Sequence, residues 1–259
     1  MHTISDMAGL LQDKVAIVTG AGQGIGRGIA RMFSLDEGAK VAVIDLDGGA
    51  ADIVAKEIIE RGGQAIAVAC DVGQRPHVDA AVAATVDAFG TIDVLVNTAI
   101  AGAPRIPLLE TTEELCDAMF RSGPLGTLFF IQACHPYMKG KDSSIINFAS
   151  GAAISGHEGY AAYAPAKEGV RVLTKVAARE LGGDGIRVNA IAPSAKTRLM
   201  QAWFDEDPDG AKASEQTVPL KRFGDPDIDI PRAAVMLASG YSGYVTGHTL
   251  MVDGGSCRF

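Results

Sequence analysis

Seven short runs of apolar, largely β-branched residues are spaced along the chain, with helical patterns between them. The runs are KVAIVT (14–19), KVAVID (40–45), QAIAVAC (64–70), IDVLVN (92–97), SIINFA (144–149), IRVNAI (186–191) and TLMVD (249–253). They are nearly continuously apolar, which is typical of parallel strands buried on both faces. Parallel strands need long crossover connections, and ADIVAKEIIERGG and VDAAVAATVDAFG are helical patterns that end at glycine. The pattern predicts an α/β fold with one seven-stranded parallel sheet and helices on both faces.

No linker rich in proline, glycine or serine divides the 259 residues, so the sequence predicts a single domain over residues 13–259. Residues 1–12 carry no strand or helix pattern, and we expect a flexible N-terminal arm. A long insertion over about 194–228 interrupts the alternation of strands and helices. We expect an irregular substrate lid there, acidic at DEDPDG.

The charge balance narrows the classes of partner. The chain carries 23 Lys and Arg against 31 Asp and Glu, a formal net charge of −8. Proteins that bind a nucleic-acid backbone or an anionic membrane surface need clustered basic side chains. We therefore expect neither a nucleic-acid nor a membrane partner.

Cysteine usage and the N-terminal residues indicate a cytoplasmic protein. Cys70, Cys116, Cys134 and Cys257 form no CxxC and have no metal-ligand spacing with the five histidines. We therefore expect reduced thiols and no metal site. The opening MHTISDMAGLLQDK lacks the features of a signal peptide, and no apolar run reaches the length of a membrane span.

A glycine-rich turn, VTGAGQGIGRGIA (18–30), follows the first predicted strand and opens the first predicted helix. Gly20, Gly24 and Gly26 allow the backbone to turn tightly and to approach a diphosphate. The helix N-terminus offers that diphosphate unpaired N–H groups and a positive dipole end. Glycines in this strand–turn–helix context predict a dinucleotide-binding site.

Asp45 ends the second predicted strand, nineteen residues after Gly26. An acidic side chain there accepts hydrogen bonds from the adenosine ribose and repels the 2′-phosphate of NADP. Gln23 and Leu46 stand at the positions where a basic side chain would bind this phosphate, and neither carries a positive charge. The sequence therefore favours NAD over NADP.

Tyr163 and Lys167 lie four residues apart, so on a helix they share one face. A tyrosine with an ordinary pKa near 10 is a poor base at neutral pH, and a neighbouring ammonium lowers that pKa. Ser150 follows the fifth predicted strand, at the sheet edge where open α/β folds bind ligands, and its hydroxyl can hold a carbonyl oxygen. Pro165 is tolerated only in a first turn, so we expect this helix to begin close to Tyr163.

Together these residues give the chain a resemblance to the short-chain dehydrogenase/reductase family over about residues 12–255. The family motif TGxxxGxG is TGAGQGIG from Thr19 to Gly26, YxxxK is Tyr163 to Lys167, and the serine thirteen residues before the tyrosine is Ser150. RVNxxxPG corresponds to RVNAIAPS, and VDGG near the C-terminus also matches. The family consists of NAD(P)-dependent oxidoreductases of this length, with a single Rossmann-type doubly wound domain.

The resemblance implies hydride transfer between a nicotinamide and a secondary alcohol or ketone. Tyr163 would donate or accept the proton, Lys167 would lower its pKa and bind the ribose, and Ser150 would orient the oxygen. The residues implied in cofactor binding are Gly20, Gln23, Gly24, Ile25, Gly26, Asp45, Leu46, Asp71, Val72, Asn97, Tyr163, Lys167, Pro193 and Thr197. The resemblance also implies a homotetramer, with a dimer as the alternative.

Two departures from the family pattern fall close to these residues. The family's NNAG is NTAI (97–100) here, with Ile100 in place of glycine. In MFRSGPLGTLFF (119–130), Gly123 stands where the family has a fourth catalytic residue, an asparagine. Either the chain is an impaired, NAD-binding regulator or scaffold, or the backbone at Gly123 serves in place of the asparagine.

Gly123 and Pro124 also interrupt a helical pattern that runs from about Thr112 to Met138. Pro124 cannot donate to the carbonyl group of Phe120, and it pushes the residue before it away from helical angles. We therefore expect a kinked helix whose bend faces Lys167, with a free carbonyl group near Gly123.

Apolar residues of the insertion and of the segment after Ser150 predict the substrate pocket. The expected lining residues are Ser150, Ala152, Met200, Trp203 and Phe204, joined by Ile100 and Ile154. The sequence thus predicts an NAD-dependent alcohol dehydrogenase or carbonyl reductase with a small to medium, fairly apolar substrate.

Overall fold

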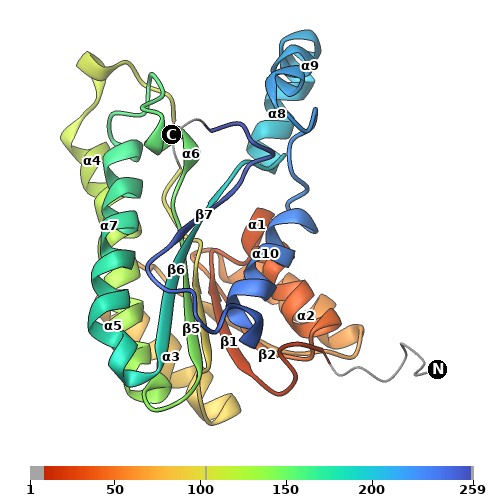
Figure 1. The fold of residues 1–259 in the computed structure, drawn as a ribbon, viewed down its shortest axis with the longest axis vertical. Helices are drawn as coiled ribbons and strands as arrows, with labels where there is room; N and C mark the ends of the chain where they lie inside the picture. The colour runs from red at the N-terminus through yellow and green to blue at the C-terminus, as the bar shows by residue number, and fades with distance from the viewer. Residues whose placement is uncertain (1–8, 103, 258–259) are drawn as a thin grey trace.

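The computed structural model describes residues 9–102 and 104–257, apart from the side chains of Arg198, Leu199, Ala202 and Trp203. In this part of the chain, seven parallel strands form one sheet in the order β3-β2-β1-β4-β5-β6-β7 (Figure 1). The strands are β1 (Val15–Thr19), β2 (Lys40–Asp45), β3 (Gln64–Ala69), β4 (Val94–Asn97), β5 (Ser143–Phe148), β6 (Ile186–Pro193) and β7 (Thr249–Val252). Every predicted strand is confirmed, and the strand order reverses between β1 and β4, as in a doubly wound fold.

Helices cover both faces of the sheet, as predicted (Figure 1). One face packs against α1 (Gly24–Arg31), α2 (Gly48–Glu60) and α10 (Asp229–Ala238), and the other against α3 (Arg75–Phe89), α5 (Gly126–Met138) and α7 (Tyr163–Leu181), with α4 (Glu113–Phe120) beside α7. The remaining helices are α6 (Gly151–Ile154), α8 (Arg198–Glu206) and α9 (Pro208–Thr217). Short 3₁₀ turns span Leu108–Glu110, Gly182–Asp184 and Gly240–Ser242, and π-helical turns span Met32–Asp36 and Arg121–Leu125. None of the described helices is long and apolar enough to cross a membrane.

Burial of the strands on both faces explains their continuous apolar runs. In β1, Ala16 and Val18 face the cluster that includes α1 and α10, whereas Ile17 faces the cluster under α3 and α5. All three residues are fully buried. The edge strand β3 differs, because Ala65 is its only buried residue and the other five are half-buried or exposed.

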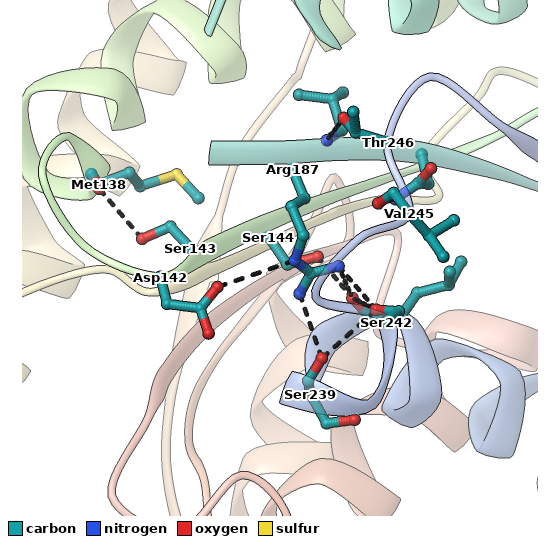
Figure 2. Close-up of polar contacts among 12 residues, drawn as sticks. Met138, Asp142, Ser143, Ser144, Arg187, Ser239, Ser242, Val245 and Thr246 are labelled. Carbon is teal, nitrogen blue, oxygen red and sulfur yellow. Dashed lines mark hydrogen bonds and ion pairs between the residues drawn. The ribbon is translucent and has the colours of Figure 1, made fainter. Parts of the chain in front are cut away.

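Arg187 ties β6 to the C-terminal end of α10 (Figure 2). Its guanidinium donates hydrogen bonds to the carbonyl oxygens of Leu237 (2.9 Å) and Ser239 (3.2 Å) and to Ser242 Oγ (2.6 Å). A positive charge is favourable there because the last carbonyl groups of a helix lack helical partners. Burial lowers the pKa of Arg187. These contacts lie at the start of β6, away from the carboxyl edge where such sheets bind ligands.

The insertion over 194–228 is largely helical between residues 198 and 217, so the expectation of an irregular segment is wrong there. It contains α8 and α9, which project from the carboxyl edge of the sheet (Figure 1). Pro208 occupies the first turn of α9, and the side chain of Asp207 accepts a hydrogen bond from the N–H of Gly210 at 3.0 Å. The acidic DEDPDG is therefore a helix start rather than a loop, because Asp at the N-cap and Pro in the first turn both favour one.

The predicted arm over residues 1–12 lies partly outside the described residues. Of its last four residues, Leu11 is 1% exposed and belongs to the core cluster under α1 and α2. The N–H of Leu11 donates to the carbonyl oxygen of Glu37 at 3.1 Å, and the N–H of Leu10 donates to Glu37 Oε2 at 2.7 Å. Ordered packing thus begins before residue 13, because Leu11 fills a core position.

Candidate active site

The glycine-rich turn connects β1 to α1 at the carboxyl edge of the sheet. Gly20 and Gly24 have φ angles of +63° and +54°, the left-handed region that favours glycine. A Cβ on Gly26 would lie 2.2 Å from the carbonyl oxygen of Gly20, so only glycine lets the turn close. A Cβ on Gly24 would meet nothing within 4 Å, so the outer side of the turn has room for a ligand.

The first turn of α1 points its N–H groups at that open side. Gln23 at the N-cap has an extended backbone, and its side chain makes no capping hydrogen bond. The N–H groups of Gly24, Ile25 and Gly26 therefore remain available to an anion. The residues present here fit the diphosphate of a dinucleotide.

Asp45 lies directly beside this turn. Its Oδ2 accepts a hydrogen bond from the N–H of Gly22 at 2.9 Å, and its Oδ1 accepts one from the N–H of Asp47 at 3.1 Å. An ionised carboxylate has about four acceptor positions, so two remain for ribose hydroxyls. The neighbouring Leu46 is 73% exposed and offers no charge to a phosphate.

Three other predicted cofactor residues have partners inside the protein. Asp71 Oδ1 accepts a hydrogen bond from a main-chain N–H two residues on, at 2.9 Å. Val72 is buried against α5, where a Cβ on Gly126 would lie 3.0 Å from it. Asn97 is buried, and its Nδ2 donates to Oδ1 of Asn147 at 2.9 Å. The Nδ2 group of Asn97 therefore links β4 to β5.

Asn147 is a structural residue that the sequence reasoning missed. Its Nδ2 donates to Thr174 Oγ1 at 2.9 Å, and that hydroxyl donates to the carbonyl oxygen of Val170 at 2.9 Å. With Asn97, these residues form a buried polar chain from β4 through β5 to α7. The signal was a polar residue inside the apolar run SIINFA, since buried polar groups require partners.

The catalytic helix α7 begins at Tyr163 with Pro165 in its first turn, as predicted. Lys167 is 4% exposed, and its Nζ donates to the carbonyl oxygen of Phe148 at 2.7 Å. The same Nζ lies 5.9 Å from the centroid of the Tyr163 ring. Both side chains therefore meet at the end of β5.

Ser150 completes this group from the other side. It precedes α6 with an extended backbone, is 8% exposed, and makes no capping hydrogen bond. Its hydroxyl lies close enough to the Tyr163 phenol to lower the pKa of that group. Ala152 lies on α6 directly after it. The structure thus brings the three predicted catalytic residues together.

Burial is the main influence on the acidity of this group. It lowers the pKa of Lys167 to about 8. Burial also raises the pKa of Tyr163; the hydrogen bond with Ser150 acts against that increase, and Tyr160 adds to it. The expected lowering of the Tyr163 pKa by Lys167 is not found in this structure, because loss of water around the phenol has the larger effect.

The interrupted helix over 112–138 is confirmed. A π-helical turn over Arg121–Leu125 separates α4 from α5. This turn accommodates Pro124, because the wider hydrogen-bonding pattern of a π-helix leaves one residue without a helical partner, and proline has no N–H to donate. The N–H of Gly126 points to the carbonyl groups of both Arg121 and Gly123, so the free carbonyl group expected at Gly123 is not found.

Gly123 and Ile100, the two departures from the family pattern, face each other. A Cβ on Gly123 would lie 3.6 Å from Ile100 Cδ1 and 3.7 Å from Ala166 Cβ, which are ordinary contacts. Ile100 packs into a small apolar cluster with Ala166 and Tyr163. The bulk absent at Gly123 is thus replaced by Ile100, and the π-helical turn faces Ala166 of α7, the residue before Lys167.

Ser122 links the bend to the loop after β4. Its Oγ accepts a hydrogen bond from the N–H of Ala101 at 2.9 Å and donates to the carbonyl oxygen of Ala118 at 2.7 Å. No pattern in the sequence marks Ser122. The contact shows how the segment that carries Ile100 is held against the bend.

The predicted pocket residues of the lid lie on α8. Phe204 packs edge-to-face against Phe223, with ring centroids 5.9 Å apart, and Lys196 Nζ lies 3.9 Å from the Phe204 centroid. Met200 is half-buried on the same helix, whereas the side chain of Trp203 lies outside the described residues. Pro193 ends β6, and Thr197 directly precedes α8.

A cavity of about 510 Å³ lies at the base of the lid. Its walls include Ser194, Leu220, Arg222 and Met251. Arg222 is paired with Asp229, so the cavity offers no free charge on that side. Ser150, Tyr163 and Lys167 do not line it, so it is separate from the catalytic group.

Within residues 9–102 and 104–257, no cluster of three His, Cys, Asp or Glu side chains is placed to hold a metal ion.

Comparison with known proteins agrees with this geometry. The family profile described as Enoyl-(Acyl carrier protein) reductase matches residues 20–256. A 12alpha-hydroxysteroid dehydrogenase of Clostridium sp. is 39% identical over 255 residues, which cover 95% of this chain and 98% of that protein.

Two solved structures are also similar. The 3-ketoacyl-(acyl-carrier-protein) reductase from Brucella melitensis, complexed with NADH, has a TM-score of 0.87 and 35% identity, with 96% of this chain and 100% of that chain covered. A 7 alpha-hydroxysteroid dehydrogenase complexed with NADH and 7-oxo glycochenodeoxycholic acid has a TM-score of 0.89 and 31% identity, with 100% and 99% covered.

Proposed function

The chain belongs to the short-chain dehydrogenase/reductase family, and from this premise we propose that it is an NAD-dependent enzyme acting on a fairly apolar secondary alcohol or ketone. Family membership makes it an oxidoreductase. The observation that carries the proposal is the meeting of Ser150, Tyr163 and Lys167 at the end of β5. We also propose, from the family resemblance, a homotetramer and a cytoplasmic location.

The residues around the glycine-rich turn support NAD as the cofactor. When bound, the nicotinamide would accept or supply the hydride. Asp45 keeps two acceptor positions for the ribose, and its negative charge opposes a 2′-phosphate. Two of the relatives named above were solved with NADH, which supports a nicotinamide cofactor. Pro193 and Thr197 would lie beside the nicotinamide ring.

Tyr163 would exchange the proton with the substrate oxygen. Its raised pKa keeps the phenol protonated at neutral pH, the form that donates to a ketone oxygen. For alcohol oxidation, the phenol must first lose its proton, and the positive charge of Lys167 favours that loss. Ser150 would hold the same oxygen, because its hydroxyl lies on the Tyr163 side of the site and influences the pKa of the phenol.

The alternative, an impaired NAD-binding scaffold, depends on Gly123 alone. The structure gives this alternative no support, because Ile100 occupies the space beside Gly123 and the catalytic group is intact. The apolar side chains Ile100, Met200 and Phe204 support a fairly apolar substrate.

A steady-state assay tests the proposal. NAD⁺ or NADP⁺ is supplied with a panel running from 2-butanol and 2-octanol to hydroxysteroids such as deoxycholate, because one relative is named for the 12alpha-hydroxyl group. We expect turnover with NAD⁺, and kcat/KM for NAD⁺ about tenfold or more above that for NADP⁺. Tight NADH binding without turnover of any alcohol or matching ketone would contradict it and support the scaffold.

A further inference from the structure

Arg105 lies beside a pair of tilted aromatic rings, Tyr160 and Tyr163, the second of which is the proposed acid–base group. Its guanidinium carbon is 5.4 Å from the centroid of the Tyr160 ring. The Tyr160 and Tyr163 ring centroids are 5.3 Å apart, with their planes at 49°. These two distances place the guanidinium carbon at most about 11 Å from the Tyr163 ring.

The backbone around Arg105 fixes this position. The N–H of Ile106 donates to the carbonyl oxygen of Gly159 at 2.9 Å, and Ile106 pairs with Tyr160 in an isolated parallel β-bridge. Gly159 has a φ of +81°, and a Cβ on it would lie 3.3 Å from the Cβ of Arg105. The loop after β4 and the loop before α7 are therefore joined where Arg105 stands, and the guanidinium is held on one side of the tyrosine pair.

Arg105 has no acidic partner in the part of the chain that the structure describes. None of the ion pairs there includes it, nor do they include Glu158, the acidic residue next to Gly159. Arg27, Arg75 and Arg222, in contrast, are each paired with a carboxylate. The planar guanidinium lies over an aromatic face and keeps its N–H donors available for a carboxylate.

The net charge of the chain bears on whether this exposed cation serves to bind anions. With a net charge of −8, the protein repels anions in general. A local positive charge beside the site is therefore the feature that would allow an anionic substrate to bind productively. Lys196, a cation at the start of the insertion over 194–228, lies over the Phe204 ring.

We propose that Arg105 forms an anion subsite, and that the preferred substrate is an apolar secondary alcohol or ketone that carries a carboxylate several carbon atoms from the reacting carbon. Arg105 binds this carboxylate in bidentate fashion while Tyr163 contacts the reacting oxygen. This inference rests on the proposed function, because Tyr163 marks where the reacting carbon lies.

Matched pairs of probes test the subsite. Deoxycholate is compared with its methyl ester, and 7-hydroxyoctanoate with its methyl ester, in wild type, Arg105→Gln, Arg105→Lys and Lys196→Gln. The control is Arg179→Gln, which removes the same charge from an exposed position in the last turn of α7. We expect wild type to favour the acid about fivefold to tenfold in kcat/KM.

In Arg105→Gln the preference for the acid should fall to about one, through a higher KM with kcat little changed, and the esters should be unaffected. Arg105→Lys should keep part of the preference, because a point charge replaces a bidentate fork. Arg179→Gln should behave as wild type.

Several outcomes would overturn the subsite while the proposed function stands. These are turnover without an acid preference in wild type, equal losses for acid and ester in Arg105→Gln, or loss of the preference in Lys196→Gln alone. If no probe is turned over, the proposed function fails instead. The subsite is then judged by calorimetric titration of the NADH-bound protein with 7-oxooctanoate and its methyl ester, where an equal affinity of wild type for both ligands would overturn it.

Discussion

The carboxyl edge of the sheet carries two candidate sites, for the cofactor and for catalysis, that are built by different means. The cofactor end, residues 18–30 with Asp45, depends on backbone geometry: left-handed glycines, a closed turn and an uncapped helix. The catalytic end, formed by the α4–α5 bend and the start of α7, depends on side-chain packing and burial. There, Lys167 is held by a main-chain carbonyl group, and Ile100 replaces bulk beside Gly123.

This difference decides how each end tolerates change. A backbone-built site fails when any Cβ enters a close approach, whatever the new side chain is. A packed site can exchange one residue for another if a neighbour supplies the volume. Gly123 lacks the side chain of the family's asparagine, and Ile100 supplies side-chain volume in its place. The loss of asparagine is therefore compatible with an active enzyme.

The largest effect is expected from Tyr163→Phe, which should impair the catalytic end and leave the cofactor end unchanged. Removal of the hydroxyl should lower kcat about 10³-fold, because the group that exchanges the proton is lost. NADH affinity, measured by fluorescence titration, should stay close to that of wild type, because the glycine-rich turn is untouched. A variant that retains more than about a tenth of the activity would show that Tyr163 is not the acid–base group.

The pH dependence of stability tests the burial of Lys167. Its pKa is about 8 in the folded protein and near 10.5 when unfolded, so between these values the unfolded chain binds more protons. The cost of the buried charge is present below pH 8 and is relieved as the pH rises. Between pH 7 and 10, wild type should gain on the order of 3 kcal/mol of unfolding free energy relative to Lys167→Met.

Urea unfolding of wild type and Lys167→Met at several pH values provides the measurement. The interval stops at pH 10 because Tyr163, whose pKa is raised, begins to titrate differently in the two states above that value. A constant difference between the two proteins, or one that favours the variant as the pH rises, would contradict the pKa shift of Lys167.

Gly26→Ala tests the closed turn of the cofactor end. A Cβ at 2.2 Å from the carbonyl oxygen of Gly20 forces the backbone of the turn apart. The free energy of unfolding should fall by about 2 kcal/mol, and NADH should bind more weakly. Gly24→Ala is the matched control, because its Cβ meets no protein atom within 4 Å. Only the left-handed φ of residue 24 destabilises this variant, by about 1 kcal/mol of unfolding free energy. Equal costs for the two variants would show that the close approach at Gly26 is not what closes the turn.

The smallest effect is expected from restoring asparagine at the bend. Gly123→Asn should cost about 1 kcal/mol without raising kcat, because a residue with a Cβ before Pro124 disfavours helical angles and the longer side chain meets Ile100. Adding Ile100→Ala should recover about half of that cost in a double-mutant cycle. A large gain in turnover from Gly123→Asn would mean that the bend does not serve catalysis as it stands.

The fold was accessible from the sequence because its signals are local. Continuous apolar runs mark strands buried on both faces, and glycines at defined spacing mark the turn that follows β1. The helices of the insertion were harder, since DEDPDG suits a loop as well as a helix start. The group of Ser150, Tyr163 and Lys167 was also accessible, through its spacing and the family resemblance.

Contacts between distant segments had no such signal. Ser122 bonds to the loop after β4, and Arg105 is aligned on Tyr160 only because two loops pair through Ile106. The sign of the Tyr163 pKa shift also required the structure, because burial depends on everything packed around the ring.

The sequence by itself determined the doubly wound sheet, the place of the glycine-rich turn and which side chains are candidates for catalysis. These follow from residue type and spacing, which act over a few positions. Only the tertiary structure decided that Ile100 fills the space beside Gly123, that Lys167 is tied to Phe148, and that Arg105 lies over the Tyr160 ring. Those properties depend on distances between segments far apart in the chain, and packing of the whole domain sets such distances.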